Sequence, residues 1–436
     1  MRRLHSYLSL VFWGLISLSV VAQEAADTEP MQGVPPSRDS QVTMKNYTQY
    51  PASRWALRNA GAPLNVVMIP REGQIVSLRG PTRPQLGQFK VTDLDKNQVD
   101  FDAAFAGSYA DGVAVVQGNQ LLHESYFGDF SPHAQHIWFS MSKSLASTAF
   151  GLLVAEGKVD LQGSPADYIP ELVGSGFERV TIQQVLDHAT SIDFHETYTN
   201  PDSDFFRYYA PALNMSWLPG SADLQPEDAD IYGVHDFLGR FIKPDPKRKP
   251  GDNFDYNSSN ADVLGWLIAR ISGQPFQEYV QRHIWAKLGA EHDAYIAVDR
   301  AYMPAVTGGM NSTLRDALRF GIMIKDRGQF NGKRIIPASW IDQTLQVSQQ
   351  LKTNMRNNRK YQADPWQAYH NMWWILDADK GEYCAVGIHG QVIYINRQAD
   401  TVMAWFSSQP GASAAGNPDF RTKLDAARQL AAALVN

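Results

Sequence analysis

The segment Ser140-Met141-Ser142-Lys143 places a hydroxyl and an amine three residues apart at the start of a helix predicted over residues 140–156. On a helix this spacing brings both side chains to one face, and the lysine leans back toward the serine. A serine becomes a good nucleophile when a neighbouring base takes its proton, and a lysine shielded from water can be that base. By itself the pattern could equally be a helix-capping serine beside a surface lysine.

Tyr256 lies in a loop that leads into a second predicted helix, over residues 259–271. Ser259 and Asp262 have the spacing of a capping box, and Gly273 is placed to end the helix. A phenol held on such a loop could shuttle protons. Taken alone, Tyr256 could also be a packed ring whose hydroxyl caps a neighbour.

The third segment, Gly387-Ile388-His389-Gly390-Gln391, runs directly into a predicted strand over residues 392–395. Glycines at the edge of a strand let the backbone approach a substrate closely. We expect the backbone N–H groups of Ile388 and Ser140 to form an oxyanion hole. For His389 a buried, supporting position is favoured over direct catalysis, and it is also kept as a candidate substrate contact.

Taken in this order, the three segments resemble the motif pattern of class C β-lactamases, penicillin-binding proteins and related esterases. Shorter stretches at 157–161, 168–172, 180–188 and 309–316 fit the same family, and the similarity runs from about residue 100 to 430. The Tyr256 segment YNSSNADVLGW and the final GIHGQ look closest to the 6-aminohexanoate-dimer hydrolase subgroup, whose members cut a linear amide and often esters.

The resemblance implies acylation of Ser140 followed by hydrolysis of the acyl-enzyme, with Lys143 and Tyr256 as one proton-handling unit and with no metal or cofactor. The implied partner is a small-molecule ester or amide. Candidate substrate contacts are Tyr198, Ser258 and Trp374, with Trp373 as the alternative to Trp374.

Two departures from the family pattern bear on the substrate. Tyr256 is followed by Asn257-Ser258, where β-lactamases carry Tyr-Ala-Asn or Tyr-Ser-Asn, and no Lys-Thr-Gly precedes the last strands. Those groups typically hold the carboxylate of a β-lactam or of peptidoglycan. A β-lactamase or DD-peptidase is therefore an alternative to the ester or amide hydrolase, and a non-catalytic binding module for peptidoglycan or a small molecule is a third reading.

The elements that must position these residues are strands near both ends of the folded part, with helices between them. A hairpin is predicted over 113–127, helices near 181–188, 312–326 and 337–346, strands over 392–395 and 402–406, and a closing helix over 418–434. The expected fold is α+β, β-lactamase/transpeptidase-like, with one antiparallel sheet, flanking terminal helices and a large inserted lobe that is mainly α.

The expected division of the chain is a signal peptide over 1–22, a flexible lead-in and extension over 23–95, and a hydrolase domain over 96–436. Within that domain the α/β part covers about 96–160 and 370–436, and the mainly α lobe about 161–369. Arg2, Arg3, an apolar run from Leu8 to Val21 and a small residue at Ala22 predict export to the periplasm or medium. An uncleaved membrane anchor is the alternative.

Composition excludes several other classes of protein. The formal net charge is -6 and no long basic run is present, so nucleic acid is not an expected partner. Neither His-Glu-x-x-His nor Gly-x-Ser-x-Gly occurs, and the nearest histidine pair, His133 and His136, has no third metal ligand nearby in sequence. Cys384 is the single cysteine and is interpreted as a buried small residue. The oligomeric state stays open.

Overall fold

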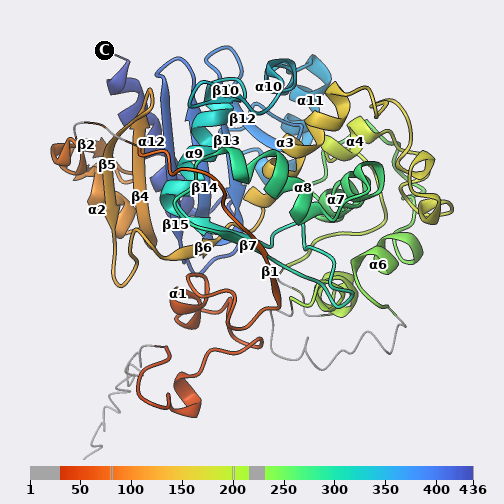
Figure 1. Cartoon of the computed structure of the whole chain (residues 1–436), viewed down its shortest axis with the longest axis horizontal. Coiled ribbons are helices and arrows are strands. Elements are labelled where there is room, and N and C mark those ends of the chain that lie inside the picture. The colour runs from red at the N-terminus through yellow and green to blue at the C-terminus, as the bar shows by residue number, and fades with distance from the viewer. Residues whose placement is uncertain are drawn as a thin grey trace, which may run out of the picture.

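The computed structural model describes residues 30–78, 80, 82–198, 200, 202–215 and 231–435 (Figure 1). The predicted signal peptide lies outside these residues. Within them, no helix combines the length and the apolar character that crossing a membrane requires.

A seven-stranded antiparallel sheet forms the body of the α/β part, in the order β11-β12-β13-β14-β15-β4-β5. Its strands come from distant parts of the chain, because β15 pairs with β4 across almost the whole sequence. The predicted hairpin and the two late strands are confirmed as β4, β5, β14 and β15. The strands are β4 (Ala110–Gln117), β5 (Gln120–Tyr126), β11 (Ala368–His370), β12 (Trp373–Asp377), β13 (Glu382–Gly387), β14 (Gln391–Asn396) and β15 (Thr401–Ser407).

Helices cover both faces of this sheet. A Cβ added at Gly321 of α9 (Leu314–Lys325) would meet Val402 at 2.6 Å, so α9 lies directly on β15. Trp405 lies on the opposite face of the same strand, where it contacts Phe105 of α2 (Phe101–Ala106). The terminal helix α12 (Pro418–Leu434) packs with α2 on that face, and its predicted bounds are confirmed.

A second, four-stranded antiparallel sheet, in the order β1-β7-β8-β6, carries the chain toward Ser140. Its strands are β1 (Val66–Ile69), β6 (Gln135–Ile137), β7 (Ala294–Ala297) and β8 (Met310–Thr313). The N-terminal extension thus supplies an edge strand to the sheet in which β6 leads to the predicted nucleophile. Two small hairpins complete the strands, β2 (Lys90–Thr92) with β3 (Gln98–Asp100) and β9 (Gln329–Phe330) with β10 (Lys333–Arg334).

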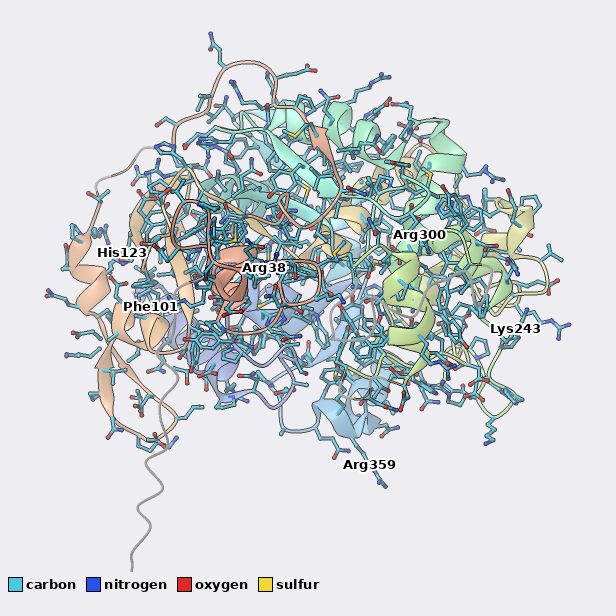
Figure 2. All side chains as sticks on the ribbon, turned by 90° about the horizontal axis from the view of Figure 1, so that it is seen from below. Arg38, Phe101, His123, Lys243, Arg300 and Arg359 are labelled. Carbon is cyan, nitrogen blue, oxygen red and sulfur yellow. The ribbon has the colours of Figure 1, made fainter. Side chains whose placement is uncertain are left out.

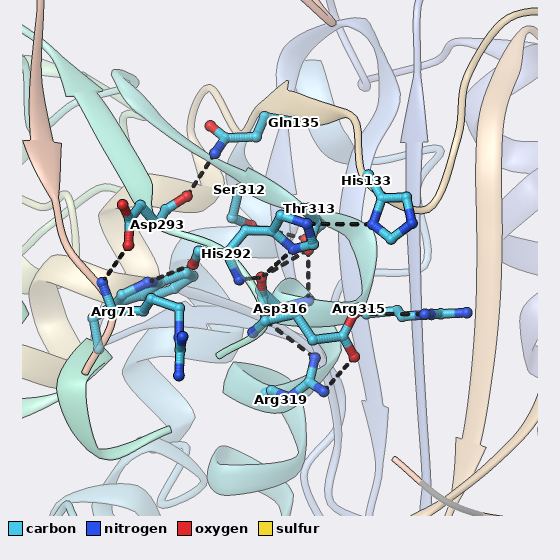
Figure 3. A network of polar contacts seen from close by, with 12 residues as sticks. Arg71, His133, Gln135, His292, Asp293, Ser312, Thr313, Arg315, Asp316 and Arg319 are labelled. Carbon is cyan, nitrogen blue, oxygen red and sulfur yellow. Dashed lines mark hydrogen bonds and ion pairs between the residues drawn. The ribbon is translucent and has the colours of Figure 1, made fainter. Parts of the chain in front are cut away.

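A polar network fixes the start of α9 to the loop before β7 (Figure 3). The carboxylate of Asp316 accepts from the backbone N–H groups of Glu291 and His292 at 2.8 and 3.1 Å. Arg319 forms ion pairs with both Asp316 and Glu291. Because these side chains are mostly buried, the network holds β7 and β8 at a fixed place relative to the main sheet.

The middle of the chain is mainly helical and packs beside the large sheet (Figure 1). Its α-helices are α3 (Met141–Ala155), α4 (Ile182–Leu186), α5 (Ala210–Ala212), α6 (Val234–Arg240), α7 (Ser259–Ser272), α8 (Phe276–His283), α10 (Ala338–Thr344) and α11 (Gln349–Asn357). Short single turns are η3 (Pro165–Asp167), η4 (Pro170–Leu172), η5 (Phe205–Tyr209), η8 (Trp285–Lys287) and η9 (Arg359–Tyr361).

The leading residues differ from the expected flexible lead-in. From Pro30 onward the chain forms turns, η1 (Arg38–Ser40) and α1 (Ala52–Ala56), followed later by η2 (Pro84–Gln88). Tyr47 and Leu57 are fully buried, and the backbone N–H of Ile137 donates to the carbonyl of Leu57 at 2.9 Å. Prolines break regular structure here without preventing packing, because enough apolar side chains remain to anchor the segment.

Candidate active site

Ser140 sits where strand β6 turns into helix α3. Phe139 has a left-handed backbone, with φ of 45°, which turns the chain sharply between the two elements. Strand pairing holds the approach to this turn, since the N–H of Trp138 donates to the carbonyl of Met310 at 2.8 Å. Ser140 is the N-cap residue of α3, yet its side chain makes no capping hydrogen bond. Its hydroxyl is therefore available for another partner.

That partner is Lys143, whose Nζ lies 2.8 Å from the Oγ of Ser140. The same Nζ also donates to the carbonyl and to the Oγ1 of Thr307, at 2.8 and 3.0 Å. The three contacts match the three protons of an ammonium group. Loss of the proton that points at Ser140 would leave both Thr307 contacts in place and aim the nitrogen lone pair at the serine hydroxyl.

Burial lowers the pKa of Lys143 to about 8, because an ammonium without bulk water is costly. The nearby carboxylates of Glu196 and Asp262 act in the opposite direction and raise this pKa. Asp262 also accepts a hydrogen bond from the N–H of Thr307 at 3.0 Å. It thereby positions Thr307, which in turn binds the ammonium of Lys143. The balance leaves Lys143 able to gain or lose a proton near neutral pH.

Tyr256 completes a cluster with Ser140 and Lys143. Its phenol lies within hydrogen-bonding reach of Ser140, and the Lys143 Nζ lies 5.2 Å from its ring centroid. Its ring stacks on Trp374 at 5.4 Å. Burial raises the pKa of Tyr256, so the phenol keeps its proton at neutral pH. Of the two groups, Lys143 is thus the one with a pKa near neutral.

His188 holds the Tyr256 loop from two sides. Its carbonyl accepts from the N–H of Asp255 at 2.9 Å, and its Nδ1 accepts from the N–H of Asn257 at 3.0 Å. Its ring packs against Tyr256 at 4.8 Å. Because Nδ1 is an acceptor, the ring proton is on Nε2. No sequence motif assigns a role to His188, although it belongs to one of the stretches that fit the family.

The predicted capping box at the start of α7 is wrong. Asp262 instead accepts from the phenol of Tyr209 and from the N–H of Thr307, while the Oγ of Ser259 donates to Asn257 at 2.6 Å. The carboxylate points away from the helix end because a buried charge finds better partners there. The predicted end of the helix at Gly273 is confirmed, with φ of 69°.

The end of strand β13 brings Ile388 close to Ser140. A Cβ added at Gly387 would lie 2.2 Å from the carbonyl oxygen of Trp138, so only glycine allows this approach. Ser140 and Ile388 then line the same cavity. This places two backbone segments where the N–H groups of an oxyanion hole would be needed.

His389 lies behind Ile388 and does not line the cavity. It adopts a left-handed backbone with φ of 58°, and its Nδ1 donates to the carbonyl of Gln409 at 2.8 Å. Burial lowers its pKa to about 4, so the ring is neutral. The hydrogen bond to Gln409 fits the supporting position favoured for His389, and a substrate contact at His389 stays a prediction.

The cavity at Ser140 has two compartments, which share Ser140, Tyr198 and Ile388. With the space that is open to solvent included, the larger holds about 460 Å³ and the smaller about 310 Å³. Tyr256 and Trp374 line the larger compartment, and Ser258 and Thr307 the smaller. The remaining walls are Lys360, Tyr361, Trp366, Val386, Gly387 and Ser413–Ala415 in the larger, and Phe139, Phe205, Tyr209, Leu213, Met215 and Gly308 in the smaller.

Three of the four expected substrate contacts, Tyr198, Ser258 and Trp374, thus lie in the cavity wall. Sequence reasoning missed Thr307, Tyr361 and Trp366, because their segments carry no motif of chemical residues at short spacing. Trp373, the alternative to Trp374, faces the interior against Phe320 and Tyr383. Alternation along strand β12 explains why only one of the adjacent tryptophans reaches the cavity.

The histidine pair considered for metal binding is separated in the structure. His136 is buried against Asp111 at 3.3 Å, whereas the ring of His133 lies near the surface beside His292 (Figure 3). In the described ranges, no three side chains of His, Cys, Asp or Glu converge as metal ligands would. Cys384 is buried in strand β13.

The arrangement is an α+β fold with a serine at a helix start beside a buried lysine. Known proteins agree with this class. The family model described as Beta-lactamase matches residues 101–428. The 6-aminohexanoate-dimer hydrolase of Paenarthrobacter ureafaciens is 29% identical over 378 residues, which cover 86% of this chain and 90% of that protein.

Solved structures show the same likeness. A Bacillus anthracis protein provisionally assigned as a 6-aminohexanoate-dimer hydrolase aligns with a TM-score of 0.76 and 26% identity, covering 92% of this chain and 98% of that one. A family VIII carboxylesterase shares the fold, with a TM-score of 0.54, 15% identity, and coverage of 80% and 99%. The chain belongs to the beta-lactamase family and is a serine hydrolase with the β-lactamase fold.

Proposed function

We propose that the protein hydrolyses small carboxylic esters or linear amides through an acyl-enzyme on Ser140. The observation that carries this proposal is the hydrogen bond of 2.8 Å between a buried Lys143 and the Oγ of Ser140, at the floor of a cavity with apolar walls. The relative from Paenarthrobacter ureafaciens, named a 6-aminohexanoate-dimer hydrolase, supports the same class of reaction.

In the proposed acylation, neutral Lys143 takes the hydroxyl proton of Ser140 while Oγ bonds to the substrate carbonyl carbon. The carbonyl oxygen gains negative charge and is stabilised by the N–H groups of Ser140 and Ile388. As the bond between the carbonyl carbon and the leaving oxygen or nitrogen breaks, Tyr256 donates its phenolic proton to the leaving atom. Lys143 then returns the proton that it took from Ser140 to the Tyr256 oxygen. Water then attacks the acyl-enzyme along the same proton path in reverse and regenerates Ser140.

A hydrolysis panel on purified protein tests this proposal. It compares p-nitrophenyl esters, a linear 6-aminohexanoate amide, nitrocefin and a D-Ala-D-Ala peptide, each with a Ser140→Ala control. We expect cleavage of esters or the linear amide that depends on Ser140. Turnover of nitrocefin or the peptide, without turnover of the esters or the amide, would instead indicate a β-lactamase or DD-peptidase. No turnover of any compound would favour a non-catalytic binding module.

The pH dependence of kcat/KM tests Lys143 as the base. Its neutral form is the reactive one and its pKa is about 8, so kcat/KM should rise with pH, by up to about tenfold per pH unit below 8, and level off above. Initial rates on a p-nitrophenyl ester between pH 6 and 9.5, corrected for spontaneous hydrolysis, provide the measurement.

Asp262→Asn is the matched variant for this profile. The carboxylate of Asp262 raises the pKa of Lys143, so its removal should move the rise in kcat/KM to lower pH. A profile that stays flat from pH 6 to 9 in the parent protein would contradict the assignment of Lys143.

We further propose that the chain is exported after cleavage following Ala22, as the composition of residues 1–22 suggests. Expression of the full chain in a Gram-negative host should give a mature protein in the periplasm or medium that begins at Gln23. Recovery of the uncut chain from the membrane fraction would instead support an anchor.

A further inference from the structure

The two compartments divide the site around the nucleophile. A substrate carbonyl must lie at Ser140, which both compartments share, so the groups on either side of that carbonyl extend one into each compartment. We call the two groups attached to the carbonyl the two limbs of the substrate. The lining residues of each compartment then indicate which charge the limb bound there can carry.

The smaller compartment has no charged side chain among its described lining residues. Its walls are apolar and aromatic, with the hydroxyls of Ser258 and Thr307. The nearest candidate for a cation-binding carboxylate is Glu196, and both its oxygens are occupied, by the phenol of Tyr198 at 2.7 Å and by the N–H of Ser258. An ammonium group placed here would lose its hydration without gaining a counter-ion.

The larger compartment has aromatic walls, and among the lining residues that the structure describes one is charged, Lys360. The ammonium of Lys360 lies 5.4 Å from the ring centroid of Tyr361, which holds it at the rim of the cavity. Lys360 is exposed and forms no ion pair with a described carboxylate. It can therefore pair with an anion without first losing an ion pair to a described carboxylate.

The positive charge at this rim extends along α11 and η9. Residues 346–361 contain Lys352, Arg356, Arg359 and Lys360 and not one Asp or Glu. Figure 2 shows Arg359 extending outward from the body of the protein. Such a one-sided group of cations raises the local concentration of anions and repels cations.

We propose that the natural substrate carries a carboxylate on the limb that lies in the larger compartment, where Lys360 pairs with it, and an uncharged limb in the smaller one. This inference rests on the proposed function, and it names the class of substrate within it. A substrate limb that ends in a free ammonium should be a poor fit, because the described lining residues of the two compartments include no carboxylate.

The test compares matched esters that differ only in charge. In the acyl position these are p-nitrophenyl hexanoate, mono-p-nitrophenyl adipate and p-nitrophenyl 6-aminohexanoate, and in the leaving position phenyl and 4-carboxyphenyl hexanoate. For at least one position we expect kcat/KM of the anionic ester to exceed that of its neutral partner, and that of the aminohexanoate to be the lowest. Raising the salt concentration should shrink the difference.

Variants of Lys360 separate charge recognition from a general effect on folding. Lys360→Gln should lower the ratio of anionic to neutral kcat/KM about tenfold, and Lys360→Glu should turn the preference toward the aminohexanoate ester. Lys333→Gln, which removes a positive charge from the exposed hairpin β9–β10 outside both compartments, should leave the ratio unchanged. Equal ratios in the parent and both Lys360 variants would overturn the inference.

A binding measurement keeps this inference distinct from the proposed function. If none of the esters is cleaved, the proposed hydrolysis fails, and charge preference is then read from calorimetric Kd values for monomethyl and dimethyl adipate. The mono-anion should bind more tightly than the neutral diester, and Lys360→Gln should remove most of that advantage. Equal affinities for the two compounds would refute the carboxylate site whatever the ester results.

Discussion

Ser140→Ala should reduce kcat/KM on every hydrolysed ester or amide by at least about 10⁴-fold, leaving only the residual rate that substrate binding and the oxyanion hole support. The variant lacks the oxygen that bonds to the substrate carbonyl carbon in the proposed mechanism, which in the parent protein lies 2.8 Å from the Lys143 Nζ. Steady-state rates with matched protein concentrations, together with loss of labelling by a fluorophosphonate, provide the measurement.

The fold should survive this change. Ser140 makes no side-chain capping bond, so the loss is confined to one contact with Lys143, worth about 1 kcal/mol. Thermal unfolding of the variant should therefore lie close to that of the parent protein. A folded variant that still turned over substrate at the parental rate would remove Ser140 from the mechanism.

Tyr256→Phe should lower kcat by about 10²- to 10⁴-fold, the usual range for a missing proton-transfer group. The ring contacts with Trp374 and His188 do not involve the hydroxyl, so they persist in the variant and the melting temperature should change little. The measurement is kcat and KM for one ester and one amide. The amide should suffer more, because its nitrogen leaves only after it is protonated.

Tyr369→Phe is the matched control for this variant. Tyr369 is another buried tyrosine, its ring lies 5.7 Å from that of Tyr256, and it does not line the cavity. The same loss of one phenolic oxygen should leave kcat close to that of the parent. Similar losses in both variants would indicate a packing effect and would argue against proton transfer by Tyr256.

Much of the framework followed from local sequence patterns. The helix over 418–434 and the end of α7 at Gly273 were predicted at their observed positions. Helix α7 has a regular apolar stripe and a glycine stop, and both are local signals. The antiparallel sheet could be predicted because β4, β5, β14 and β15 each show a strand pattern bounded by turns.

Other features were hidden because they depend on contacts between distant segments. Thr307 carries no motif, yet its backbone and hydroxyl hold Lys143. The capping box at Ser259 failed because Asp262 found buried partners in Tyr209 and Thr307, which local spacing cannot reveal. The motifs predicted Ser140, Lys143 and Tyr256 as site residues. Their catalytic roles stay predictions until the variants are measured.

Pairing between distant strands also sets the order in which the protein can become active. Strand β6, which leads to Ser140, pairs with β8, while Lys143 is held by Thr307 from the same distant region. Ile388 arrives later still, between β13 and β14. A chain still being synthesised would already carry Ser140 but would have neither its base in position nor its oxyanion hole. Hydrolytic activity should therefore emerge only after nearly the whole polypeptide has been made and has folded.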